Sequence, residues 1–509
     1  MENKKTKIIS IVAVVALALT VITATYAYFN AQVGDPAAAD IKVNANTVDT
    51  FTFSNGNAIS FSINQDNFAS GKGNQTGSTY ASATLTANNK TNTATEHYYL
   101  YLNIESNTFT YSINESTPEI IMTVTDGNGN EVTDISTLNH VIVTGANGPQ
   151  VSGYDITNKN GLITLFNNRK ITTTSSKEEK WNIKVTFVNY DASQNANAGK
   201  SMSAKVIIQK EVIPKVVSDV CTNGENLATC ITTLARKSSS SITKIYHHDA
   251  SLTNGAGDNS YRFAGASDQV NNYVCFGSSE ASCPADNLYR IIGVFGDKVK
   301  LIKNTSVGHM AWDTNGSNTW STSSLNTYLN NEFINTFDET TRGKIDMTTW
   351  KVGGNTYANI VKQPAKTAYQ NEIVNPVTTN STDNAKEYSA KIGLMYASDY
   401  GFAAAPSAWT ANLGGYNGTA IISVNWMYMG LFEWTISRDA ESSNAVFHLT
   451  NDGDLHLNFA RFVTHKNTVR PVFYLSSSVN YASGSGSATD PISINWLTDS
   501  FEKASVKPG

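Results

Sequence analysis

The sequence predicts a mainly β protein with an N-terminal antiparallel β-sandwich and a C-terminal α+β domain, preceded by one apolar N-terminal helix. Three observations carry this prediction. The chain of 509 residues is too long for a single hydrophobic core. Its first half repeats short runs in which apolar and polar residues alternate, which is the period of a β-strand. Charged residues make up only 16 %, while 23 Tyr and 20 Phe supply the apolar surface that folded cores need.

The N-terminal helix is expected over residues 8–27, which contain no charged side chain and follow a lysine-rich start. This arrangement is typical of a signal peptide or a membrane anchor, so we expect the rest of the chain to lie outside the cell. Thr25 and Ala27 are small enough for the recognition pockets of a signal peptidase, which makes Ala27 the candidate cleavage site. If this site is not cleaved, residues 8–27 are long enough to hold the protein in the membrane. Residues 1–27 are therefore assigned to a signal peptide or an anchor.

The β-sandwich is expected over residues 28–212. Alternating runs are separated there by clusters of Asn, Gly and Ser, with almost no helical periodicity. The clearest runs are residues 51–53, 59–63, 98–104, 120–124 and 181–187. Residues 126–130 resemble the start of a calcium loop, but Glu131 stands where such a loop needs glycine. A hairpin turn is the better interpretation of this segment.

The second domain is expected over residues 245–494, after a linker at 213–244 that contains a short helix. Pro214 marks the boundary, because proline after a strand ends regular pairing. Within the domain, two apolar runs, residues 288–295 and 299–302, lie on either side of Gly296 and Asp297. They predict a hairpin with its turn at these two residues. The clearest helix is expected at 321–337, where apolar residues recur at spacings of three and four. Residues 495–509 are assigned to a C-terminal tail.

The four cysteines lie in one stretch, at Cys221, Cys230, Cys275 and Cys283. In an oxidising exterior, neighbours in sequence are expected to pair, Cys221 with Cys230 and Cys275 with Cys283, although two other connectivities are open. A zinc or redox site would need Cys-x-x-Cys spacing, which these gaps do not have. The pairs are therefore interpreted as structural disulfides.

A hairpin around residues 451–453 contains the one candidate metal site. With Gly453 in the left-handed conformation, the register forms two cross-strand pairs, Leu449 with Leu455 and His448 with His456. Two imidazoles at this distance, with His465 near in sequence, are ligands that zinc accepts. Two histidines on a solvated hairpin face are more often plain surface residues, and no carboxylate or cysteine completes the shell. We therefore expect no cofactor.

Part of the second domain resembles known bacterial modules. Residues 246–249 (YHHD), 255–258 (GAGD), 260–263 (SYRF), 272–277 (NYVCFG) and 283–293 (CPADNLYRIIG) resemble a recurrent module of surface proteins from low-GC Gram-positive gut bacteria. Residues 320–325 (WSTSSL), 329–333 (LNNEF), 433–438 (EWTISR) and 469–475 (VRPVFYL) resemble a large uncharacterised bacterial domain family. The resemblance covers about residues 246–494 and implies a C-type-lectin-like fold, akin to the formylglycine-generating-enzyme type.

Two departures from that fold's known sites limit what the resemblance implies. Calcium-dependent lectins use Glu-Pro-Asn or Gln-Pro-Asp, whereas Gln363 and Pro364 are followed here by Ala365, which has no carboxylate. The oxidase branch needs a reactive cysteine pair late in the domain, and no cysteine follows Cys283. Calcium-dependent sugar binding and oxidase chemistry are therefore both disfavoured.

The N-terminal half is similar to another family. Residues 25–30 (TYAYFN) after the apolar run, followed by a predicted sandwich, are similar to the export signal and fold of the TasA and camelysin family of biofilm-fibre proteins. Such subunits join by strand exchange. The similarity implies that residues 40–53 are a donor strand for self-association.

Together these features favour an exported cell-surface protein that recognises a glycan or protein ligand without catalysis. The alternative is a structural subunit of a surface fibre or biofilm matrix that assembles through the sandwich. An extracellular enzyme is a remote alternative, because the sequence has no nucleophile elbow, phosphate loop or His-Glu-x-x-His motif. The net charge of -5, without a basic run beyond the start, disfavours nucleic-acid binding.

Candidate ligand contacts are aromatic and basic residues on irregular segments, where exposed rings give contact area at low entropic cost. Two segments qualify, residues 405–418 and 458–467. The candidates are Trp409, Tyr416, Phe459, Arg461 and His465. For each of them, packing or passive surface is the more frequent role of such a residue, and ligand contact is the less frequent one.

Overall fold

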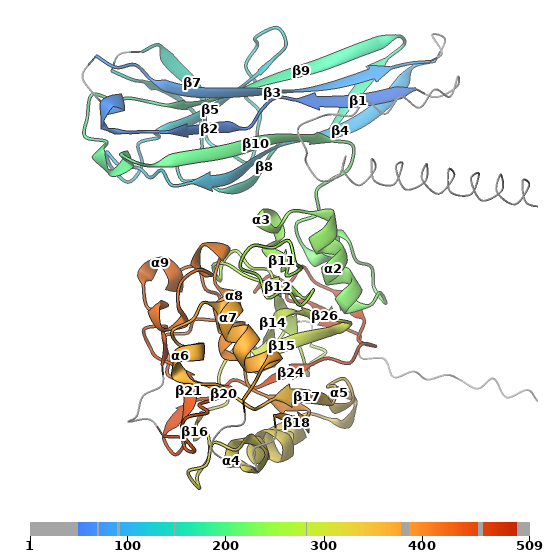
Figure 1. The fold of residues 1–509 in the computed structure, drawn as a ribbon. Helices are drawn as coiled ribbons and strands as arrows, with labels where there is room; N and C mark the ends of the chain where they lie inside the picture. The colour runs from blue at the N-terminus through green and yellow to red at the C-terminus, as the bar shows by residue number, and fades with distance from the viewer. Residues whose placement is uncertain are drawn as a thin grey trace, which may run out of the picture. The chain divides into compact units, whose positions relative to one another are not determined.

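The computed structural model describes residues 49–68, 71–88, 92–146, 148–280, 282–377, 386–456 and 462–495 (Figure 1). The chain forms two compact units, residues 1–213 and 214–509, which divide between Ile213 and Pro214. Both units are built mainly from antiparallel strands, as the sequence predicts. The expected apolar helix and the candidate cleavage site at Ala27 lie outside the described residues.

The N-terminal unit contains two antiparallel sheets (Figure 1). One sheet has six strands in the order β1 (Thr50–Asn55), β3 (Gln75–Thr86), β9 (Ser176–Phe187), β5 (Ile120–Asp126), β7 (Gln150–Asp155) and β6 (His140–Thr144). The other has four strands in the order β2 (Ile59–Ser62), β10 (Ser201–Gln209), β4 (Ala94–Asn107) and β8 (Gly161–Thr173). Short helices η1 (Gln65–Phe68) and η2 (Asn195–Asn197) connect strands.

The two sheets of this unit share one buried core. Leu102 on β4 and Met202 on β10 belong to the same cluster as Met122 on β5 and Ile183 on β9. Each of these strands alternates buried and more exposed residues along at least part of its length, which is the pattern from which strands were predicted. The unit is therefore the β-sandwich that the sequence indicates.

The segment that resembles a calcium loop is a tight turn. The backbone N–H groups of Asn128 and Asn130 both donate to Asp126 Oδ1 at 2.8 Å, and Gly129 takes a left-handed conformation. The side chain of Asp126 therefore satisfies its own turn, which confirms the hairpin interpretation.

The C-terminal unit contains two larger sheets and two strand pairs. The seven-stranded sheet consists of β11 (Ile245–His247), β12 (Tyr261–Phe263), β14 (Leu288–Phe295), β15 (Lys298–Lys303), β24 (Val472–Tyr474) and β19 (Ile392–Gly393), with β13 (Tyr273–Cys275) also paired to β14. The five-stranded sheet consists of β16 (His309–Ala311), β23 (Lys466–Thr468), β20 (Glu433–Arg438), β21 (Val446–Leu449) and β22 (Leu455–His456). The pairs are β17 (Thr348–Lys351) with β18 (Glu387–Ala390) and β25 (Tyr481–Ser483) with β26 (Ser493–Ile494).

Short helices cover these sheets and connect their strands (Figure 1). They are η3 (Val217–Asp219), α2 (Leu227–Lys237), α3 (Ser240–Thr243), η4 (Ala285–Asn287), η5 (Trp320–Thr322), α4 (Ser324–Thr327), η6 (Tyr328–Glu332), η7 (Phe333–Thr336), α5 (Glu339–Gly343), α6 (Tyr357–Ile360), α7 (Ala365–Tyr369), η8 (Gln370–Val374), α8 (Ala397–Ala403), η9 (Pro406–Ala408), η10 (Leu413–Gly415) and α9 (Thr419–Ile422). Both larger sheets contribute to one hydrophobic core, for example through Leu301 on β15 and Phe447 on β21.

The predicted helices form with one difference. The linker helix is α2, whose first turn is capped by the Asn226 side chain accepting the Thr229 N–H at 3.0 Å. The helix expected at 321–337 is instead a succession of 3-10, α, π and 3-10 turns, in which Leu325, Leu329 and Phe333 are buried. The apolar spacing therefore identified the buried face, whereas the changes in winding follow from packing.

Both predicted disulfides are present. Cys221 pairs with Cys230 and Cys275 with Cys283, at Cα–Cα distances of 5.5 and 5.7 Å. Two disulfides fit an oxidising environment such as the cell exterior. Within the described part of the chain, no helix has the length and apolar character to cross a membrane.

Candidate functional site

The irregular segment 404–432, named here the surface loop, is the clearest candidate site in the C-terminal unit. Its regular structure is limited to η9, η10 and α9, each of three or four residues. Ordered segments of this length without longer elements are uncommon and are often functional. The loop begins directly after α8 and ends at β20, so both of its ends are fixed by the core.

Two buried aromatic side chains attach the surface loop to the core of the unit. Trp409 Nε1–H donates to the Ala404 carbonyl at 2.8 Å, and the Tyr416 hydroxyl lies 3.1 and 3.2 Å from the carbonyl oxygens of Gly401 and Ala408. Their exposed fractions are 1 % and 0 %. The prediction that Trp409 and Tyr416 expose contact area for a ligand is therefore wrong. Both are packing residues, because each ring has an apolar pocket and each polar atom has a carbonyl acceptor.

Other side chains of the surface loop are exposed. Met429 and Leu431 are each 38 % exposed and flank Gly430, whose φ of +66° turns the backbone sharply. Exposed apolar side chains that are neighbours mark interaction sites more often than single ones do, which are a normal part of a protein surface. Sequence reasoning missed these two residues, because an apolar residue near a buried strand is normally assigned to the core.

The turn between β21 and β22 supports the same surface. The Tyr428 hydroxyl donates to the Asn451 carbonyl at 2.8 Å. A Cβ placed on Gly453 would lie 2.7 Å from Ile422 Cγ2 and 3.1 Å from the Tyr428 ring, so the turn packs closely against the loop. Ile422, Tyr428, Met429, Leu431 and residues 451–453 are named here the Met429 surface.

Of the other three predicted contacts, the structure describes one, His465. Phe459 and Arg461 lie outside the described residues. His465 is exposed in the turn before β23, where its backbone N–H donates to the Phe462 carbonyl at 2.8 Å. Phe462 is itself 40 % exposed, so this turn presents a second, smaller apolar feature.

The histidine hairpin has the predicted register. His448 pairs with His456 and Leu449 with Leu455, and the two imidazole centroids are 6.2 Å apart. The prediction of a solvated histidine face is wrong for His448, which is buried against the Trp434 ring at 5.8 Å. Alternation assigns residues to opposite faces of β21, but it does not reveal that both faces are covered.

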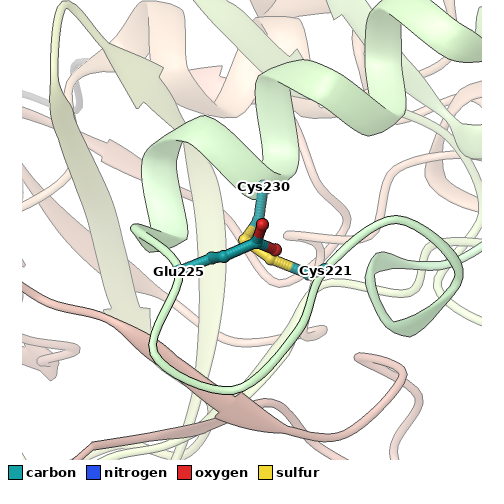
Figure 2. A group of neighbouring side chains, drawn as sticks. All are labelled: Cys221, Glu225 and Cys230. Atoms are coloured by element: carbon teal, nitrogen blue, oxygen red, sulfur yellow. A yellow bond between two sulfur atoms is a disulfide. The ribbon is translucent and has the colours of Figure 1, made fainter.

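The described residues bring no third ligand to the histidine pair. The one group of three ligand-type side chains found among them is Cys221, Glu225 and Cys230, which Figure 2 shows at the start of α2. Both sulfurs of this group are joined in a disulfide and are therefore not available as thiolate ligands (Figure 2).

Several charged side chains are buried in the C-terminal unit, and their pairing was not predicted from the sequence. Arg470 forms a bidentate pair with Glu433 at 2.7 and 2.9 Å, whose carboxyl pKa is raised by burial. Arg262 Nη2 lies 2.6 Å from Asp258 Oδ2, and the pKa of Asp258 is lowered to about 2, since the Arg262 charge and hydrogen bonds outweigh burial. Each of these cations therefore has a carboxylate partner within the fold.

Comparison with known proteins found a family that part of this unit matches. Residues 296–477 match a family described as a domain of unknown function (DUF6273). No curated protein and no solved structure matches the chain. The match supports the resemblance to an uncharacterised domain family, and it supports neither the lectin-like fold nor the TasA-like region. The matched residues include the whole surface loop and the turn at 451–453, so the Met429 surface lies within the DUF6273-like region.

Proposed function

We propose that this is an exported cell-surface protein whose C-terminal unit binds a protein or glycan ligand, without catalysis, through the Met429 surface. The observation that carries the proposal is the exposure of Met429 and Leu431 on a long irregular loop with a rigid base. The disulfides and the lysine-rich, apolar N-terminus support export.

Pre-organisation is the physical reason that such a surface suits recognition. Trp409 and Tyr416 fix the loop before any ligand arrives, so binding would not have to order the backbone. Exposed Met and Leu side chains gain free energy when a partner covers them, and Met adapts its shape to the contact. These apolar side chains favour a protein ligand over a glycan, because sugars are recognised chiefly through polar groups and aromatic rings.

The test is a double substitution, Met429→Ser with Leu431→Ser, in the full exported chain. The affinity for the ligand is expected to fall at least about tenfold, because each lost apolar contact is worth about 1 kcal/mol or more at an interface centre. The matched control is Met347→Ser, which alters an apolar residue that is 60 % exposed outside the surface loop. Equal affinity of the folded double variant and the control would refute the proposal.

One observation favours the fibre subunit as a second candidate function. Strand β1 is the edge strand of the six-stranded sheet and pairs with β3 along all six of its residues, from Thr50 with Thr86 to Asn55 with Ala81. The same pairing between two copies would link them by strand exchange. The donor segment expected at 40–53 lies partly outside the described residues.

Deletion of residues 40–53 tests this candidate. If the protein assembles through β1, the full exported chain forms concentration-dependent oligomers in analytical ultracentrifugation, and the deletion removes them. Oligomers that persist after the deletion would exclude strand exchange through this segment.

A further inference from the structure

A lysine and an aspartate meet deep inside the C-terminal unit. Lys300 on β15 and Asp399 on α8 have side chains that are 1 % and 2 % exposed, and Lys300 Nζ lies 2.5 Å from Asp399 Oδ2. The Tyr396 backbone N–H also donates to this oxygen, at 2.9 Å, as the cap of α8. The amine nitrogen therefore contacts an oxygen that is bonded to the carboxyl carbon, and a second hydrogen bond from Tyr396 fixes the position of that oxygen.

Aromatic rings enclose the lysine amine. Its nitrogen lies 4.7 Å from the ring centroid of Tyr396, 5.4 Å from those of Phe295 and Tyr474, and 5.7 Å from that of Trp350. Four rings around one amine exclude water from it. Water exclusion favours condensation over hydrolysis, because the reverse reaction needs water at the same atoms.

The ion pair between Lys300 and Asp399 is energetically unfavourable at this buried position. Burial lowers the pKa of the Lys300 ammonium, which favours the uncharged and nucleophilic amine. Arg262 approaches Asp399 Oδ1 only to 3.7 Å and has its closer partner in Asp258. Replacing the Lys300–Asp399 pair by a neutral group would remove two buried charges and leave Arg262 still paired.

We propose that Lys300 and Asp399 condense to an intramolecular amide bond that cross-links β15 to α8. The bond forms between Lys300 Nζ and Asp399 Cγ, while one Cγ–O bond breaks. The ammonium supplies two protons and the carboxylate one oxygen to the water that leaves, so atoms and charge balance without an oxidant or a co-reactant. The Tyr396 N–H is placed to stabilise the negative oxygen of the tetrahedral intermediate.

The cross-link would strengthen the base of the surface loop. It joins residues 99 positions apart and fixes α8, which ends directly before residue 404. Closing a chain segment of this length restricts the unfolded state in the same way as a disulfide, and it persists under reducing conditions. The bond does not depend on the proposed ligand, so either proposal can fail without the other.

Peptide mass spectrometry of the full exported chain tests the bond. After reduction and alkylation, trypsin would cleave an unlinked chain after Lys298, Lys300 and Lys303. The proposed bond blocks cleavage at Lys300, so we expect residues 299–303 joined to residues 392–438, lighter than the two peptides together by one water molecule. Recovery of separate, unmodified peptides 299–300, 301–303 and 392–438 as the main species would overturn the proposal.

Two controls make the result specific. Lys298 Nζ and Asp346 Oδ2 also lie 2.5 Å apart, but their side chains are 37 % and 24 % exposed, so this pair should remain unlinked. Lys300→Arg keeps a cation beside Asp399 but cannot form the amide, so its 392–438 peptide should appear unmodified. A linked 392–438 peptide in this variant would contradict the assignment to Lys300.

Discussion

His248 shows how one buried residue makes the stability of the C-terminal unit depend on pH. Its ring packs against Phe402 and Trp409, and its Nδ1 accepts the Ala256 N–H at 3.0 Å, so the neutral form carries its proton on Nε2. Burial, and secondarily the charge of Arg262, lowers the pKa of His248 from 6.5 to about 2. The folded protein therefore keeps this imidazole neutral where an unfolded chain would protonate it.

We predict that the free energy of unfolding falls as the pH falls below about 6.5. At His248 the unfolded chain binds a proton there while the folded chain does not until about pH 2, so this residue alone contributes a slope that approaches about 1.4 kcal/mol per pH unit. Urea titrations between pH 7.5 and 4.5 measure this slope. Tryptophan fluorescence reports mainly on the C-terminal unit, since only Trp181 lies in the N-terminal one.

The control separates His248 from other groups. His248→Gln should reduce the slope, because glutamine cannot take up the proton, and His247→Gln is the matched control at the neighbouring histidine, whose side chain is 38 % exposed. An equal slope in all three proteins would show that His248 is not the origin of the pH dependence.

Among single residues, the sequence predicted the cysteine partners better than it predicted which side chains are exposed. The cysteine partners followed from their proximity along the chain, and both pairs are present. The sequence favoured packing for Trp409 and Tyr416 but did not exclude ligand contact, because a ring among Ala, Gly and Asn has no periodicity that assigns it to a face. The buried carboxylates Glu433 and Asp399 were also missed, since their cationic partners come from distant strands.

The turn between β21 and β22 is the element on which the Met429 surface depends most directly. Gly453 has a φ of +99°, which side chains other than glycine rarely adopt, and a Cβ there would collide with Ile422. We predict that Gly453→Ala destabilises the unit by about 1–3 kcal/mol and weakens ligand binding, because the turn must move away from the loop.

Thermal unfolding and ligand titration of the same variant measure the two effects. Gly415→Ala is the matched control, because an added methyl group there meets open space and the backbone needs no positive φ. A Gly453→Ala protein as stable as this control would contradict the packing described for the turn.

For helices and strands, the periodicity of apolar residues predicted the type of the element and the register of the β21–β22 hairpin. It did not predict the kind of helical turn. The β21–β22 register was predictable because a three-residue turn with a left-handed glycine leaves one pairing of the flanking strands. The π turn at η6 was not predictable, because apolar spacings of three and four residues do not distinguish it from an α-helix.

For the whole molecule, the sequence predicted two folded units and a mainly β architecture. Alternating runs specify a sandwich, because each strand must bury one face. The order of the strands in the seven-stranded sheet was not predictable, since β24 joins β15 to β19 across long stretches of chain and no local signal encodes such pairings. The Met429 surface was not predictable for the same reason, because it combines the surface loop with a turn some twenty residues further along the chain.

The central claim is that the C-terminal unit recognises a ligand through the Met429 surface. The most direct measurement is an array of cell-surface proteins, host glycans and bacterial cell-wall polymers. It is probed with the full chain and with its Met429→Ser, Leu431→Ser variant, in the presence and absence of a chelator. We expect saturable binding to one ligand class, which the variant loses and the chelator does not change. A blank array with folded protein, or equal binding by the variant, would contradict it.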